Sequence, residues 1–196
     1  MDNADEQGRN RPRKTARPLD RARLNELALA YVARFATSGG RLSAYLARKI
    51  RERGWDDEVP PDVAALVETM VGRGYVDDAG FALARGAGMM RRGFGARRIA
   101  ETLSRDGIGA PLVAQASGSV HERRVAALAF ARRRRLGPFG TGSGDSGLDP
   151  ATRARQVAAM LRAGHPFATA AALIDAADDI AAQEWVDEAD EAQDFH

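Results

Sequence analysis

The segment IAETLSRDGI at residues 99–108 sets the pattern for the chain, because LARKIRERGW at 46–55 and QVAAMLRAGH at 156–165 repeat it. In the first two segments, aliphatic residues stand eight and four positions before a glycine; the third has Gln156 and Met160 there, with Val157 and Leu161 displaced by one. The aligned glycines, 53 and 57 residues apart, are Gly54, Gly107 and Gly164. Such self-similarity predicts an all-α protein of three tandem three-helix, helix-turn-helix-like repeats that form an elongated array. Chance similarity is the open alternative, because many helices end in glycine.

Apolar residues at helical spacing extend this pattern toward the N-terminus and predict three helices within about residues 20–73. We therefore expect nine helices in groups of three, and no sheet. Residues 1 to about 18 and 186–196 are polar and charged, so we expect them to be mobile. The expected boundaries are a disordered basic arm at 1–18, repeats at 19–75, 76–118 and 119–182, a Gly/Ser linker at 137–149, and an acidic tail at 183–196.

Charge is strongly segregated along a chain whose net charge is only +2. Residues 85–135 hold twelve arginines against three acidic residues, whereas residues 175–196 hold nine acidic residues and no Lys or Arg. A basic body with an acidic tail favours a polyanion, or a partner of mixed charge, as the target. Ordinary solvated helix faces with a self-shielding tail are the competing interpretation.

Several classes of protein are disfavoured by composition. The chain has no cysteine, so disulfides and thiolate metal sites are absent. Its first twenty residues lack the apolar core of a signal peptide, and no apolar run approaches the roughly 18 residues of a membrane span. We expect a cytoplasmic protein with no membrane partner, no metal site and no cofactor.

The segment GYVDDAGFA at residues 74–82 raises the question of paired carboxylates. Asp77 and Asp78 follow an apolar stretch and precede Phe81 in a helix-like pattern, and Asp is a preferred N-cap residue. Neighbouring residues at a helix start diverge by about 100°, which opposes convergence on one proton or one ion. We interpret the pair as a helix cap and first-turn residue in preference to a catalytic dyad.

Two further motifs lie in the Gly/Ser-rich stretch, where residues 142–147 fit G-x-G-x-x-G and residues 144–147 read GDSG. A dinucleotide loop needs a preceding strand, and a serine nucleophile needs an oriented histidine on a preformed scaffold. An arginine-rich helix precedes this stretch, and His121 and His165 are expected at helix ends. We predict a flexible linker and no catalytic residue, and an enzyme using Ser146 is the weakest alternative.

Arginine is the main chemical signal, because its planar fork recognises phosphate and carboxylate groups. On a helix at about 95–106, Arg97, Arg98 and Arg105 are expected opposite Ile99 and Leu103, and their replacement should therefore spare the core. Favourable charge at a helix C-terminus is the competing explanation for the quartet at 132–135. The candidate contact residues are Arg91, Arg92, Arg97, Arg98, Arg105, Arg132, Arg133, Arg134 and Arg135.

The central part of the chain resembles the signature of the RecX family, the bacterial regulators of RecA recombinase. The residues that carry the resemblance are Gly74-Tyr75-Val76-Asp77-Asp78, Phe81-Ala82, Arg91, Gly95, Arg98-Ile99, Glu101, Leu103 and Gly107-Ile108. The resemblance covers about residues 22–175; it departs at Gln156, where an aliphatic residue is usual, and at the Gly/Ser insertion.

This resemblance implies a protein of tandem three-helix repeats that binds RecA filaments on DNA and has no catalytic activity of its own; we expect a monomer. It would restrain ATP hydrolysis, strand exchange and filament growth in recombinational repair and the SOS response. It would contact single- and double-stranded DNA directly or through the filament. By position, Gly74, Tyr75, Asp77, Asp78, Phe81 and Gly107 resemble structural residues, while Arg91 and Arg98 resemble contact residues. A helix-turn-helix-like DNA-binding protein acting without RecA is the alternative function.

Overall fold

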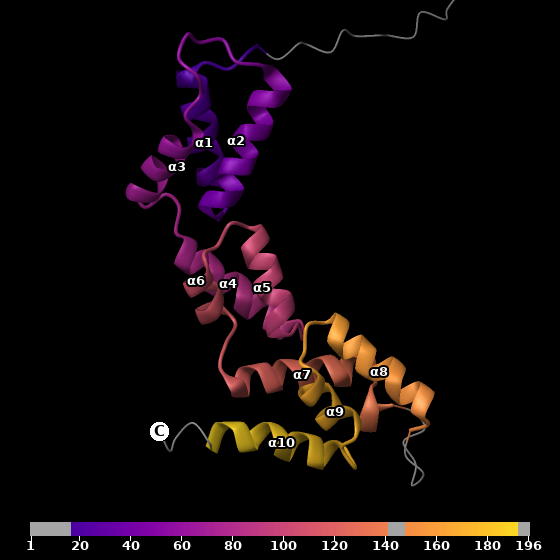
Figure 1. The fold of residues 1–196 in the computed structure, drawn as a ribbon. Coiled ribbons are helices and arrows are strands. Elements are labelled where there is room, and N and C mark those ends of the chain that lie inside the picture. The colour runs from indigo at the N-terminus through magenta and orange to yellow at the C-terminus, as the bar shows by residue number, and fades with distance from the viewer. Residues whose placement is uncertain (1–16, 141–147, 192–196) are drawn as a thin grey trace, which may run out of the picture.

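The computed structural model describes residues 17–140 and 148–191, and the secondary structure of this part of the chain is helical apart from an isolated bridge between Leu19 and Trp55 (Figure 1). The helices are α1 (Arg21–Arg34), α2 (Gly39–Arg53), α3 (Val63–Gly72), α4 (Asp78–Arg91), α5 (Ala96–Arg105), α6 (Ala110–Ala116), α7 (Val120–Arg134), the 3-10 helix η1 (Gly137–Phe139), α8 (Pro150–Arg162), α9 (Phe167–Ile174) and α10 (Asp179–Glu191). The all-α prediction is confirmed, but nine helices were too few.

Three separate hydrophobic cores lie one after another along an elongated molecule (Figure 1). The first is built by α1–α3, the second by α4–α6, and the third by α7–α10 with η1. The aliphatic pairs recognised in the sequence lie in the first two cores: Leu46 of α2 and Ile99 and Leu103 of α5 are fully buried, and Ile50 of α2 is partly buried against the first core. Each core is small, so contacts between neighbouring groups contribute to holding the molecule together.

The first two groups meet where the start of α2 touches the end of α5. The Ser38 hydroxyl donates to the Asp106 carbonyl, and the Gly39 amide donates to Asp78 Oδ1 at 2.9 Å. Gly40 packs on Gly107 so closely that a Cβ on Gly40 would lie 2.6 Å from the Gly107 Cα. Gly40 and Gly107 are almost 70 positions apart in the chain, and this contact requires both of them to lack a side chain.

The second and third groups meet in the same way, with the start of α5 against the end of α8. The amide of Gly95 donates to the Ala163 carbonyl at 2.9 Å, and the amide of Arg97 donates to the Gly164 carbonyl at 3.3 Å. The free amides at the start of α5 therefore satisfy carbonyl groups at the end of α8. Gly95 and Gly164 are again in close contact, since a Cβ on Gly95 would lie 2.4 Å from the Gly164 carbonyl carbon.

These two junctions join α8, α5 and α2 end to end along one side of the molecule (Figure 1). The three glycines aligned in the sequence stand at the ends of these same helices, with φ values of 80°, 81° and 97° at Gly54, Gly107 and Gly164. Positive φ favours glycine, and the absence of a side chain permits the close approach at the two junctions. We call α2, α5 and α8 the helix column.

The prediction of an acidic tail is wrong for residues 183–191, because these residues belong to α10. Ala182 and Val186 are fully buried in the third core, and Trp185 packs against that core. Arg124 of α7 lies over the Trp185 ring at 4.1 Å and pairs with Glu188 at 3.8 Å. Apolar residues every three or four positions thus form a helix despite the acidic composition. The remaining tail at 192–196, and the basic arm up to residue 16, lie outside the described residues.

The prediction of a flexible linker at 137–149 is also wrong for the first residues of that range. Residues 137–139 form η1, and Gly137 is buried with φ 55° against Leu173 and Ile174 of α9. Its amide donates a hydrogen bond to Gln156 Oε1 at 2.6 Å. Gln156, the departure from the repeat pattern, therefore has a specific partner. The GDSG motif at 144–147 lies outside the described residues.

Asp77 caps α4, as the sequence predicted: its Oδ1 accepts the Gly80 amide at 2.9 Å. We expect Asp77→Ala to lower the free energy of unfolding by about 0.5–2 kcal/mol, because an orphan helix amide loses its acceptor. Asp77→Asn retains an acceptor and should have a much smaller effect. Urea denaturation measures both changes, and a loss of activity in Asp77→Asn at unchanged stability would contradict a purely structural role.

His165 gives the second junction a predicted dependence on pH. Its side chain is buried, and its Nε2 lies 3.0 Å from the Gly93 carbonyl. Burial lowers the pKa of His165 from the ordinary value of 6.5, against the opposing effect of the Gly93 hydrogen bond. As the pH falls below about 6.5, the unfolded chain binds a proton that the folded chain resists, so stability should decrease.

The measurement is the unfolding free energy of wild type and His165→Gln as a function of pH. The contribution of His165 is fully present above about pH 6.5 and is lost as the pH falls toward its lower folded-state pKa. His165→Gln should therefore flatten the slope on the acid side, while His121→Gln serves as the control for removing a histidine elsewhere. Equal slopes for wild type and His165→Gln would refute this origin of the pH dependence.

Candidate interaction surface

The three candidate arginines of α5 are all exposed and lie opposite the buried Ile99 and Leu103, as the sequence predicted. Their environments differ. Arg97 donates through Nη2 to the Leu161 carbonyl of α8, and Arg105 donates through Nε to the Glu101 carbonyl at 3.0 Å. In the part of the chain that the structure describes, no hydrogen bond or ion pair involves the Arg98 guanidinium. Arg97 differs from the other two because its guanidinium links two helix groups, and the expectation that its replacement costs little stability is still a prediction.

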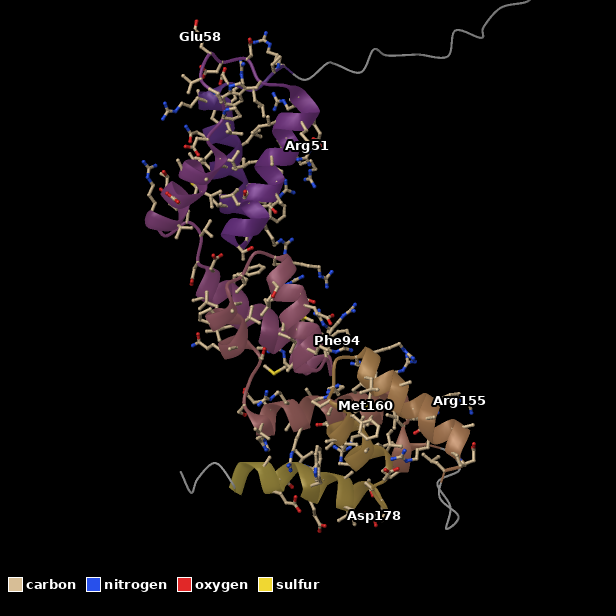
Figure 2. The ribbon with its side chains drawn as sticks, viewed as in Figure 1. Arg51, Glu58, Phe94, Arg155, Met160 and Asp178 are labelled. Carbon is tan, nitrogen blue, oxygen red and sulfur yellow. The ribbon has the colours of Figure 1, made fainter. Side chains whose placement is uncertain are left out.

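Exposed arginines continue along the outer face of the helix column on both sides of α5. In Figure 2, Arg51 of α2 and Arg155 of α8 lie on the same side of the molecule. The only exposed acidic residues on α2, α5 and α8 are Glu52 and Glu101. We define the arginine ridge as the seven exposed arginines of these helices: Arg48, Arg51, Arg97, Arg98, Arg105, Arg155 and Arg162.

The ridge is basic in its net effect even where acids are present. Arg48 lies 3.6 Å from Glu52, and Arg97 lies 3.7 Å from Glu101, which leaves five arginines without an acidic partner on the ridge. Arg153 of α8 does not belong to it, because its guanidinium binds Asp175 through both Nε and Nη2. That interaction lowers the pKa of Asp175 and neutralises the pair.

Sequence reasoning missed four members of the ridge, Arg48, Arg51, Arg155 and Arg162, although part of the signal was present. Arg98 and Arg155 both stand nine positions before their aligned glycines, and Arg105 and Arg162 both stand two positions before them. Aligning the segments on Gly107 and Gly164 therefore finds the two arginines of α8. Arg48 and Arg51 do not share these positions, and they become recognisable only when α2 is placed in the column.

The structure does not bring the other candidate arginines onto the ridge. Arg91 and Arg92 end α4, where Arg92 lies over the Phe94 ring at 5.9 Å. The quartet ends α7: Arg132 contacts Gln183 of α10 at 3.2 Å and covers Phe139, while Arg135 adopts φ 53°. Arg133 lies over the Phe130 ring at 5.7 Å. Arg91 and Arg92 therefore lie at a helix end in the second group, and the quartet lies at a helix end in the third group.

The signature residues surround the first junction. Gly74 follows α3 with φ 71°, Asp78 accepts the Gly39 amide, and Gly107 contacts Gly40. Phe81 lies between Arg41 and Arg85, with its ring centroid 5.7 and 5.9 Å from the two guanidinium carbons. Tyr75 is half exposed, although its amide is bound to Met70. A structural role for Tyr75 is still a prediction.

The ridge can bind an extended anion through two kinds of interaction. Guanidinium groups donate paired hydrogen bonds to phosphate or carboxylate oxygens, and their summed positive potential attracts a polyanion before contact. Within residues 17–140 and 148–191, we find no group of three or more His, Asp or Glu side chains arranged to hold a metal ion. Nor does any helix in these two ranges have the length and apolar character required to cross a membrane.

Comparison with known proteins shows a similarity over most of the chain. The chain is 33% identical over 185 residues to Regulatory protein RecX of Myxococcus xanthus (strain DK1622), and the match covers 89% of this chain and 94% of that protein. No protein-family model matches the chain. The similarity therefore spans all three helix groups and is not confined to the central signature.

Proposed function

Because this chain belongs to the RecX family of regulatory proteins, we propose that it binds RecA filaments on DNA and inhibits RecA ATPase, strand exchange and filament growth. The observation that carries the proposal is the arginine ridge, which extends over all three helix groups. An extended filament offers repeated anionic groups, both phosphates and acidic side chains, and a ridge of seven arginines can contact several of them at once.

We propose further that the three helix groups are tandem copies of one three-helix unit, and that α10 is an addition to the third copy. The equivalent ends of α2, α5 and α8, and the equivalent contacts at the two junctions, support this view. In such an array each unit can present the same face to successive subunits of a filament.

The test is RecA ATPase activity on single-stranded DNA, titrated with this protein at a fixed DNA concentration. Inhibition by amounts far below those needed to cover the DNA is expected for a protein that acts on the filament. If inhibition requires enough protein to cover the DNA, and if raising the DNA concentration reverses it, the proposal fails. The helix-turn-helix-like DNA-binding protein acting without RecA then becomes the better explanation.

A further inference from the structure

Three aromatic rings lie together beside the arginine ridge, on the first helix group. Tyr31 of α1 and Tyr45 of α2 have ring centroids 4.2 Å apart and an interplanar angle of 21°. Phe35, the residue after α1, adds a third ring whose centroid lies 5.3 Å from that of Tyr31. A surface that bound an anion only through arginines would not need this row of rings.

Cations surround these rings. Arg34 lies over Phe35 at 5.5 Å, and both Arg48 and Lys49 lie over Tyr45, at 5.6 and 5.9 Å. Arg48 is itself a member of the ridge, so the aromatic row and the ridge are continuous. Aromatic rings interleaved with basic side chains form surfaces that bind unpaired bases and their phosphates together.

Core packing explains only part of this row. Tyr31 and Tyr45 pack against the first core, but Phe35 is not among the residues of that core and is 50% exposed. Tyr31 holds this ring at the surface, and the flexible Arg34 side chain over it must move aside for the ring to stack on a ligand. Phe35 is therefore the part of the row available to a partner.

The place of Tyr45 in the sequence supports a link to the ridge. Tyr45 stands nine positions before Gly54, which is where α5 and α8 carry Arg98 and Arg155 before their own glycines. A guanidinium suited to phosphate is thus replaced in the first group by a ring. At this one aligned position the second and third groups carry a guanidinium and the first group carries an aromatic ring.

We propose that Phe35, supported by Tyr31 and Tyr45, stacks on the bases of single-stranded nucleic acid, whose phosphates follow the arginine ridge. The inference rests on the proposed function, because it assigns the ridge to the nucleic acid of the filament. Duplex DNA is a poor ligand for this surface, since its bases are already stacked on one another and cannot stack on a protein ring. An acidic protein segment would satisfy the arginines but would leave the rings without a partner.

The test compares binding of the full-length protein, without RecA, to two fluorescent oligonucleotides of equal length and charge. One is oligothymidylate, and the other is the same sugar-phosphate backbone without bases. Wild type should bind the thymidylate more tightly by about fivefold to about a hundredfold, the range expected for a stacked base. Phe35→Leu should reduce this preference, Phe35→Trp should retain it, and Phe167→Leu should leave it unchanged, because Phe167 is an exposed phenylalanine of α9 away from the row.

Equal binding of the two oligonucleotides by wild type, or binding to neither, would overturn the stacking surface. So would an unchanged base preference in Phe35→Leu. If Phe35→Leu folds poorly in a thermal melt, Phe35→Trp decides the question, because a ring at this position must preserve the preference. The ATPase titration tests the proposed function independently, since loss of base preference need not change inhibition by the arginines.

Discussion

Replacing Arg98 and Arg155 together by glutamate is expected to weaken inhibition of the RecA ATPase at least about tenfold, with little change in stability. The two residues occupy equivalent exposed positions on α5 and α8, so one double variant tests two helix groups. Each reversal removes a charge-assisted hydrogen bond, for which about 1.5–3 kcal/mol is typical, and adds repulsion from the anionic partner. Surface substitutions of this kind usually change stability by less than about 0.5 kcal/mol.

The matched control is the double variant Arg21→Glu with Arg73→Glu. Both residues are exposed on the first helix group outside the column, and the change in net charge is the same. This control should inhibit nearly as well as wild type, because only long-range attraction is reduced. Equal inhibition by the Arg98/Arg155 variant and the control would remove the ridge from the mechanism.

Three related measurements separate the contributions. The pair Arg98→Glu with Arg105→Glu confines the reversal to α5, and a smaller effect than that of Arg98/Arg155 would indicate that the groups bind independently. Binding dominated by phosphate should weaken steeply with rising salt, whereas ion pairs buried against RecA should weaken less. The quartet variant Arg134→Glu tests the remaining candidate surface on α7.

Gly40→Ala is expected to destabilise the protein by about 1–3 kcal/mol, although the same change in most helices is stabilising. Gly40 lies inside α2, where a Cβ would stand 2.6 Å from the Gly107 Cα and 2.7 Å from the Asp106 carbonyl oxygen. Both neighbours are backbone atoms, so relief requires separation of the first two helix groups. The penalty of this clash exceeds the gain in helix propensity.

Gly88→Ala is the matched control, since Gly88 lies inside α4 and the nearest side-chain atom to an added Cβ would be Arg91 Nη2 at 3.8 Å. Here helix propensity acts alone, and we expect stabilisation by about 0.5–1 kcal/mol. Urea denaturation of both variants under one set of conditions measures the difference in sign. Stabilisation by both substitutions would show that the junction is not tightly packed in solution.

Local patterns in the sequence predicted the helices well where apolar residues recur at helical spacing. Ile99, Leu103 and the cap at Asp77 are examples, because each depends on neighbours within one turn or two. The same reasoning missed α10, although Ala182, Val186 and Ala189 have helical spacing. There, the high density of acidic residues concealed a short apolar stripe of small side chains.

Contacts between helix groups were beyond prediction from local patterns. The Gly39 amide meets Asp78, and Arg97 meets the Leu161 carbonyl, across separations of 39 and 64 residues. The aligned glycines were interpreted only as helix ends, whereas the structure places Gly107 and Gly164 in contact with the preceding group as well. The ridge was found on α5 alone because its continuation depends on how α2 and α8 are placed.

The end-to-end arrangement of the helix column has a mechanical consequence. Helices are stiff along their axes, but each junction rests on a few hydrogen bonds and on contacts between glycines without side chains. Bending of the molecule should therefore concentrate at these two points while the three cores move as rigid segments. Small rotations there would change the curvature of the whole basic face, allowing it to follow the pitch of a helical partner as that pitch changes.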